Sequence, residues 1–310
     1  MDTTPVGRSG LRVSDIGLGT LEWGGRVDAR TAGELLERYL DLGGSLVELP
    51  SAVSPAAEIL GSLLPDTGAD SQPILCARSG VRMAADGPVA DASRGTLLGQ
   101  LDAVLATLGR SAVDLWVIDV WDASVPLDET LSAMETAWRS GRVRYLGLSH
   151  YAAWQIAAVA GQLPVTAVLA EHSLVHRAAE PDLLQVCDHY GIGVIAGAAL
   201  GRGVLTGKYA SGVPQGSRGA DAALSRYVSQ RLGEREKRVV QGVLRAAHGL
   251  NLTPVQIALA WSAAKPGISS RLVAPRNVAQ LEEVMTAELP ELPEEILQAL
   301  DEVSGESRSI

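Results

Sequence analysis

Residues Gly43–Gly61 read GGSLVELPSAVSPAAEILG, and this stretch decides the fold. The run Ser45–Glu48 predicts a buried strand, because it is short, apolar and bounded by glycine and proline. The Pro-, Ser- and Ala-rich segment after it predicts a turn, and the residues around Glu58–Gly61 predict a helix. A strand, a short loop and a helix form the repeating unit of parallel α/β folds.

The same unit recurs along the chain. A short hairpin at Val6–Arg12 comes first, and seven further apolar runs resemble Ser45–Glu48 in length and flanking residues. The eight expected strands are Val13–Leu18, Ser45–Glu48, Ile74–Arg78, Asp114–Trp121, Val143–Ser149, Ala167–Glu171, Val194–Leu200 and Arg271–Ala274. A helical pattern follows each expected strand, and one of these helices is Ser93–Leu108, with Ser93 as its cap. Extra helices are expected at Gln230–His248, Val255–Ala264 and Pro293–Val303.

This order predicts an α/β protein with a (β/α)8 TIM barrel, an N-terminal β-hairpin and extra C-terminal helices, as a single domain over residues 1–310. The alternative is a doubly wound open sheet. It is disfavoured because Gly17–Gly19 lacks a third glycine at the required spacing and does not open a helix. In a barrel, the functional residues are expected at the C-terminal ends of the strands.

Composition narrows the classes of partner. The chain has 310 residues, 46% of them hydrophobic, and a formal net charge of -10, which argues against nucleic acids and anionic membranes. The two cysteines, Cys76 and Cys187, fall in an apolar strand and a helix, and no cluster has the spacing of a metal site. The first ten residues hold no apolar run. We therefore expect a cytoplasmic protein with a small-molecule substrate and no metal.

Several framework motifs resemble those of one enzyme family. They are Gly17–Thr20 (GLGT), Glu58–Gly61 (EILG), Val143–Ser149 (VRYLGLS), Gly203–Tyr209 (GVLTGKY) and the run Arg276–Glu283. Together they resemble the aldo-keto reductases, most closely the bacterial and potassium-channel β-subunit branches. The resemblance covers nearly the whole chain. It implies reduction of a carbonyl by NADP(H), with a Tyr as general acid, a Lys–Asp pair beside it and a His that orients the carbonyl.

The catalytic positions implied by this resemblance are all substituted. Glu48 stands at the Asp position, Val53 at the Tyr position, Arg78 at the Lys position and Asp119 at the His position. A valine has no proton to donate, and an arginine stays protonated at any working pH. The usual ketone reduction is therefore expected to be absent or very slow.

The cofactor positions implied by the resemblance are partly substituted as well. His150, Leu169, Gly197, Ala274 and Val284 replace residues that contact the cofactor in the family. The positions that persist are Lys208, Arg276, Gln280 and Glu283, with backbone positions near Leu200 and Gly203. Since several lost polar contacts would weaken binding by orders of magnitude, we expect no cofactor and keep NADP as the alternative.

Four charged or titrating side chains are expected to meet at the barrel mouth. These candidate catalytic residues are Asp119, Glu48, Arg78 and His150. A two-pronged Glu48–Arg78 pair would leave Asp119 as the freer carboxylate, with a raised pKa. The opposing interpretation is that the cluster is structural and only fills space.

A wall of larger side chains is expected around this mouth. Trp23, Trp121, Tyr151 and His172 are candidate substrate-binding residues, although packing is the simpler role for His172. Glu22 and Glu171 belong to the same rim, and Arg202 is expected on a solvated loop. The long segment Gly201–Ser229 has the length and composition of a lid.

Three functions follow from these residues. The first is non-redox acid–base chemistry on a small organic metabolite, such as cyclisation, dehydration, isomerisation or epimerisation. The second is an NADP(H)-dependent oxidoreductase with an atypical active site. The third is a non-catalytic binding or regulatory barrel.

Overall fold

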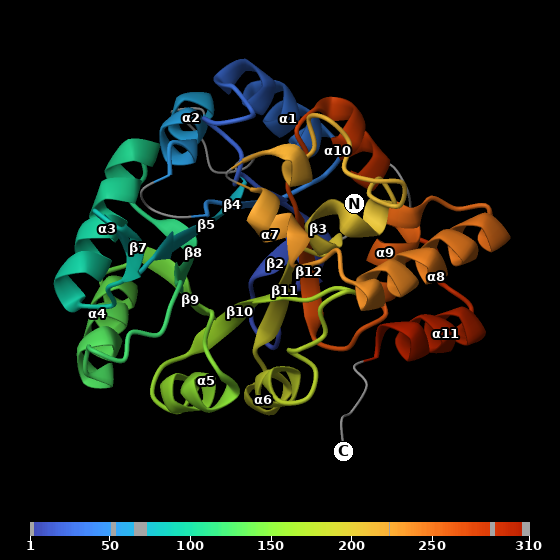
Figure 1. Ribbon diagram of the computed structural model, residues 1–310. Helices are drawn as coiled ribbons and strands as arrows, with labels where there is room; N and C mark the ends of the chain where they lie inside the picture. Colours follow the sequence, from blue (N-terminus) through green and yellow to red (C-terminus); the bar gives the residue numbers. More distant parts are fainter. Residues whose placement is uncertain (1–2, 51–53, 65–72, 223, 286–288, 306–310) are drawn as a thin grey trace.

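Eight parallel strands close into a barrel in the computed structural model, which describes residues 3–50, 54–64, 73–222, 224–285 and 289–305 (Figure 1). Around the barrel the strands are β3 (Ile16–Gly19), β4 (Leu46–Glu48), β5 (Ile74–Ser79), β8 (Val113–Ile118), β9 (Val143–Ser149), β10 (Val165–Glu171), β11 (Gly193–Gly197) and β12 (Ile268–Val273). The predicted (β/α)8 barrel is confirmed.

Helices cover the outside of this barrel (Figure 1). They are α1 (Ala29–Asp41), α2 (Ala56–Leu63), α3 (Arg94–Leu108), α4 (Leu127–Arg139), α5 (Ala153–Ala160), α6 (Leu183–Tyr190), α9 (Pro254–Ala263) and α10 (Val278–Met285). The helix α8 (Glu234–Leu250) contacts both α9 and α11 (Glu294–Ser304). Within the described part of the chain, no helix combines the length and apolar character that crossing a bilayer requires.

Local signals in the sequence account for several element boundaries. The Ser93 hydroxyl accepts a hydrogen bond from the backbone N–H of Thr96, so the expected cap of α3 is confirmed. Thr253 and Gln256 form a reciprocal capping box at the start of α9, with Pro254 in the first turn. The buried Tyr39 hydroxyl lies 2.8 Å from the carbonyl oxygen of Ile16 and accepts a hydrogen bond from the backbone N–H of Leu46, and so it ties α1 to two barrel strands.

An antiparallel hairpin of β1 (Thr3–Pro5) and β2 (Arg12–Ser14) lies at the N-terminal end of the barrel. Its connection approaches the start of β11 closely at Gly7. A Cβ at Gly7 would lie 2.3 Å from the carbonyl oxygen of Gly191, and the residue has φ +57°. Only glycine fits both conditions.

The structure departs from the expected elements in a few places. Asp15 interrupts the expected first strand, so β2 belongs to the hairpin and β3 to the barrel. The fourth barrel strand ends at Ile118 rather than Trp121. An unexpected second hairpin, β6 (Val81–Ala84) and β7 (Gly87–Ala90), follows β5. Its exposed strands lack the apolar alternation that marks a half-buried strand, although Asp86-Gly87 is a turn signal.

Candidate functional site

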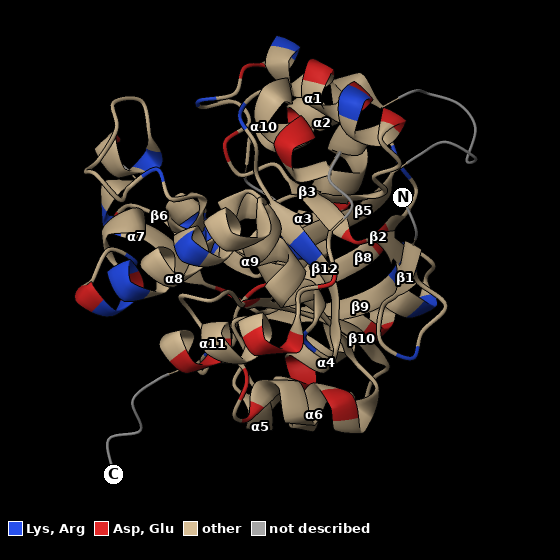
Figure 2. Ribbon diagram, turned by 90° about the vertical axis from the view of Figure 1, so that its right-hand side faces the viewer, with Lys and Arg blue, Asp and Glu red and all other residues tan. Residues whose placement is uncertain are grey.

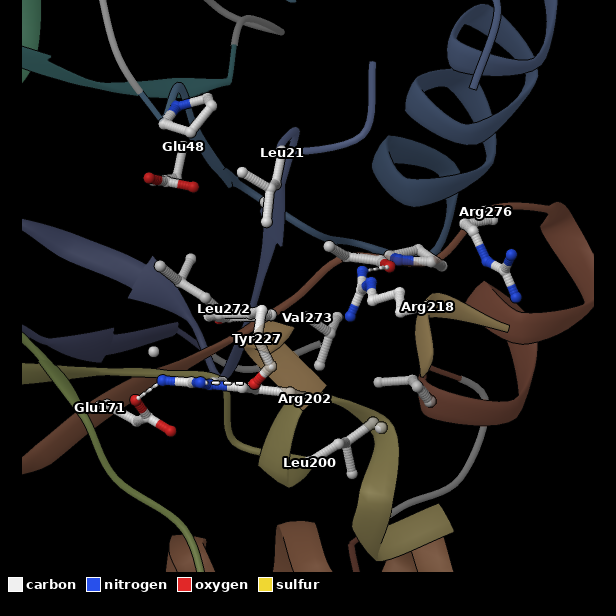
Figure 3. Close-up of a pocket in the computed structure, with 18 of the residues that line it drawn as sticks. Leu21, Glu48, Glu171, Leu200, Arg202, Arg218, Tyr227, Leu272, Val273 and Arg276 are labelled. Carbon is white, nitrogen blue, oxygen red and sulfur yellow. Dashed lines mark hydrogen bonds and ion pairs between the residues drawn. The ribbon is translucent and has the colours of Figure 1, made fainter. Parts of the chain in front are cut away.

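A cavity of about 760 Å³ opens at the C-terminal ends of the barrel strands. Figure 3 shows Glu48 on one side of this cavity and Arg276 on the other, with Arg218 on the same side as Arg276. We call it the first cavity. Its walls hold all the cofactor-binding candidates together with Glu48, Arg78 and His150, while Asp119 does not line the cavity and meets it only through its contact with Arg78.

At one end of the first cavity, Arg78 lies between two carboxyl groups. Its Nε lies 2.7 Å from Glu48 Oε1, and its Nη1 donates a hydrogen bond of 2.9 Å to Asp119 Oδ1. Glu48 ends β4, Arg78 stands on β5 and Asp119 follows β8, so three neighbouring strands supply the cluster. Arg78 therefore uses a different nitrogen for each carboxyl group, and the expected two-pronged contact with Glu48 does not form.

The two carboxyl groups of this cluster differ in acidity. Burial, opposed by Arg78 and reinforced by Asp119, raises the pKa of Glu48. Burial also acts to raise the pKa of Asp119, but hydrogen bonds and charges from His150 and Arg78 outweigh it and hold that pKa low. The expectation that Asp119 is the freer carboxylate with a raised pKa is wrong, because Asp119 is the group that contacts both Arg78 and His150. Glu48 is therefore the weaker acid of the two carboxyl groups.

His150 connects the cluster to solvent. Its Nδ1 lies 2.9 Å from the carbonyl oxygen of Asp119 and 3.4 Å from Asp119 Oδ1, while its side chain is 69% exposed. A carbonyl oxygen only accepts hydrogen bonds, so Nδ1 carries the proton. The hydrogen bond to Asp119 raises the pKa of His150. The residue reaches this position with φ +55°, an uncommon conformation for a non-glycine residue.

Cations gather at the other end of the first cavity. Lys208, Arg218 and Arg276 all line it. Burial and the positive charges of Arg218 and Arg276 lower the pKa of Lys208. Among the described residues, no carboxylate forms an ion pair with the Lys208 ammonium group. Arg218 is paired with Glu22, but the Lys208 ammonium group beside Arg218 and Arg276 favours an anionic ligand group between them.

The other cofactor-binding candidates lie around these cations. Leu200, Gly203, Gln280 and Glu283 line the same cavity. The side-chain oxygen of Gln280 accepts a hydrogen bond of 3.0 Å from the backbone N–H of Arg276, so Gln280 supports the loop before α10.

The insertion after β11 extends across the mouth of the first cavity. It contains η2 (Gly201–Thr206), η3 (Arg218–Ala220) and α7 (Ser225–Ser229), and Figure 2 shows basic residues concentrated around α7 and α8. Arg218 forms an ion pair with Glu22 and donates a hydrogen bond of 3.0 Å to the carbonyl oxygen of Ala274. The predicted lid segment is therefore fastened to the loop after β3 and to the end of β12.

A second set of ion pairs joins the insertion and the residues just after it to β10. Arg202 and Arg231 bind separate oxygens of Glu171, at 2.6 Å and 2.9 Å. The guanidinium of Arg202 also lies 3.7 Å from the centre of the Tyr227 ring. The expectation that Arg202 lies on a solvated loop is wrong, because its side chain is only 10% exposed. Local sequence carried no signal for this role, since its partners come from β10 and from the end of the insertion.

The four candidate substrate-binding residues lie apart from the lining of the first cavity. Trp23 is buried in the core and His172 is fully buried, stacked on Trp261 with ring centres 5.3 Å apart. The packing role for His172 is the one that this geometry supports. Trp121 and Tyr151 pack edge to face beside α5, with centres 5.5 Å apart. Val53 lies outside the described residues.

The buried His172 leads to a prediction about stability in acid. Glu180 accepts hydrogen bonds from His172 and Arg177, at 2.9 Å and 2.6 Å, and these outweigh burial and lower its pKa to about 2. The stability that this provides is present above the ordinary pKa of 4.5 and is lost as the pH falls towards 2. We expect Glu180→Gln to lower the free energy of unfolding by about 2 kcal/mol at pH 7 and by less at pH 3, measured by urea unfolding.

The matched control is Glu135→Gln, which removes an exposed ion pair with Arg139 on α4. It should change stability by about 0.5 kcal/mol or less. An equal loss for Glu180→Gln at both pH values would contradict the proposed ionisation.

Comparisons with known proteins agree with this fold. The sequence profile of the aldo/keto reductase family matches residues 15–304. The chain is 28% identical, over 98% of its length and 96% of the relative, to the uncharacterized oxidoreductase YrpG of Bacillus subtilis (strain 168). It is 30% identical, over 96% of its length and 95% of the relative, to a protein of Oryza sativa subsp. japonica named as a probable voltage-gated potassium channel subunit beta. A protein of the same name in Arabidopsis thaliana is 28% identical over 96% of the chain and 95% of its own length. This chain belongs to the aldo/keto reductase family.

Proposed function

We propose that the chain is an NADP(H)-dependent oxidoreductase with an atypical active site, acting on a small organic carbonyl compound. The observation that carries this proposal is the first cavity itself, which has Lys208, Arg218 and Arg276 at one end and the Glu48–Arg78–Asp119 cluster at the other. An elongated anionic ligand with a reactive group at its far end suits this arrangement. The family, and the printed name of the Bacillus subtilis relative as an oxidoreductase, support the same conclusion.

The residues at the cationic end fit the phosphate groups of a dinucleotide. Lys208 supplies an ammonium group with no carboxylate partner among the described residues, and Arg276 lies at the loop that leads into α10. Arginine and lysine together can hold several phosphate oxygens. The opposite end is apolar beside His150, where Leu169, Ala170 and Gly197 form the wall. A nicotinamide ring there would be held by packing more than by hydrogen bonds.

NADPH, when bound, would supply hydride to the carbonyl carbon of the substrate. The carbonyl oxygen then needs a proton, and Glu48 is the buried acid whose raised pKa keeps that proton available. Arg78 remains protonated and balances the negative charge of Asp119. His150, exposed and hydrogen-bonded to Asp119, gives protons from solvent a route towards the cluster.

Titration with NADPH tests the cofactor, with fluorescence or calorimetry as the readout. We expect saturable binding, and Lys208→Ala should weaken it about 10- to 100-fold because a charged hydrogen-bond partner of a phosphate is lost. The matched control is Lys237→Ala, which removes an exposed lysine of α8 and should leave the dissociation constant unchanged. Absence of NADPH binding to the unmodified protein would refute the proposal.

Leu169, Ala170 and Gly197 offer no side-chain hydrogen bond to the amide of a nicotinamide, and this favours a second candidate function, non-redox acid–base catalysis. In that case the first cavity would hold a substrate whose protons are moved by Glu48 and Asp119. The outcome that selects this function is turnover in the absence of any nicotinamide cofactor, with sharp losses in both Glu48→Gln and Asp119→Asn.

A further inference from the structure

A second cavity, of about 1040 Å³, lies between α5 and α6. It shares four lining residues with the first cavity, namely His150, Leu169, Ala170 and Glu171. The two cavities therefore meet at the rim of the barrel. A molecule in the second cavity would have one end beside the candidate acid–base cluster.

The walls of this second cavity are built from small side chains with aromatic side chains among them. Its alanines are Ala152, Ala153, Ala157, Ala170, Ala178 and Ala179. Trp154 and Tyr190 also line it and are 64% and 41% exposed, so both present ring surface to solvent. Alanine at these positions leaves a space that a flat ring system can enter. The concave shape and the volume are those of a small-molecule site rather than of a protein-docking face.

Neighbouring rings hold Trp154 in place. It packs edge to face against Trp121, with ring centres 5.4 Å apart, and Trp121 packs in the same way against Tyr151. Trp121 in turn packs against the hydrophobic core. A tryptophan that is ordered by its neighbours, and yet exposed, offers a stacking surface that needs little further ordering on binding.

The polar side chains of the second cavity include three imidazoles, beside the carboxylates of Glu171 and Asp182 and the amide of Gln185. His150, His176 and His189 line it, together with Asp182. Imidazole nitrogens donate or accept hydrogen bonds, and so they suit hydroxyl and carbonyl oxygens on a ring.

We propose that the second cavity binds a planar aromatic molecule with hydroxyl or carbonyl substituents, stacked on Trp154 and with an oxygen towards His150. The ligand site is inferred from the second cavity alone. Identifying this ligand as the substrate, with its carbonyl group at the junction with the first cavity, rests on the proposed function.

Equilibrium dialysis with 2-naphthol, without any cofactor, tests the ligand site, because this probe is flat, phenolic and has no carbonyl to reduce. We expect saturable binding and about tenfold weaker binding for Trp154→Ala, since the stacking surface is lost. Trp154→Phe should stay within about threefold of the unmodified protein. Ala157→Leu should also weaken binding, because it fills the space between α5 and α6 while keeping a strong helix former.

The matched control is Trp138→Ala, which removes a 38%-exposed tryptophan from α4 and should leave binding unchanged. The proposal is overturned if 2-naphthol does not bind saturably, or if Trp154→Ala binds it as well as the unmodified protein does. Failure of NADPH to bind, with 2-naphthol binding still dependent on Trp154, would refute the proposed function and leave this ligand site standing. If NADPH binds but 2-naphthol does not bind in a way that depends on Trp154, only the ligand site is refuted.

Discussion

Replacing Arg78 with methionine is expected to lower the free energy of unfolding by about 3–5 kcal/mol at pH 7, because it removes the guanidinium that lies between two buried carboxyl groups and leaves Asp119 with His150 alone. Glu48 and Asp119 are 4% and 9% exposed, so water cannot readily take over the role of the guanidinium. Urea unfolding followed by circular dichroism measures the loss. Because the orphaned carboxyl groups would take up protons, we expect the variant to regain part of its stability at pH 4.

Two further variants serve as controls for Arg78→Met. Arg78→Lys keeps the charge and should lose less stability. The combination of Arg78→Met with Glu48→Leu and Asp119→Leu removes every charge of the cluster and should recover much of the loss. If Arg78→Met alone unfolds within 1 kcal/mol of the unmodified protein, the cluster is not the coupled ionic unit described above.

Glu48→Gln is expected to reduce kcat about 10²- to 10⁴-fold with little change in fold, since the substitution keeps the size of the side chain and removes its acidic proton. The assay is oxidation of NADPH with 9,10-phenanthrenequinone as substrate. The rate of the unmodified protein should fall as the pH rises through the raised pKa of Glu48, because reduction needs the protonated carboxyl group. The Glu48→Gln variant should lack this dependence.

Glu135→Gln, on the exposed face of α4, is the control for the loss of a carboxylate elsewhere. His150→Gln distinguishes the second possible donor. If Glu48→Gln retained both the rate and the pH profile while His150→Gln lost them, the proton would come from the imidazole and the role assigned to Glu48 would be wrong.

The barrel could be predicted because each strand is a short apolar run and each is followed by a helical pattern. Val143–Ser149 was predicted with its observed bounds, and Ile74–Arg78 to within one residue. The errors occur where tertiary context decides. Asp15 breaks a run that is apolar on both sides, and β6 and β7 are exposed strands whose pairing has no hydrophobic signature.

The positions of the charged residues could be predicted, while their protonation could not. Glu48, Arg78 and Asp119 end neighbouring strands, so their meeting follows from the barrel. The acidity of each carboxyl group depends on which of them His150 contacts. That contact depends on the left-handed backbone conformation of His150, which no local sequence pattern predicts. Arg218 was missed for a similar reason, because its partners come from the loop after β3 and the end of β12.

The two fastenings of the insertion have a kinetic consequence. Arg218 joins it to Glu22 on one side of the mouth, and Arg202 and Arg231 join it to Glu171 on the other. We expect a long ligand beneath it to dissociate more readily when one of these pairs separates. The residence time of the ligand should therefore depend on how fast these ion pairs break. Raising the ionic strength should increase the rate of ligand release while leaving the barrel folded.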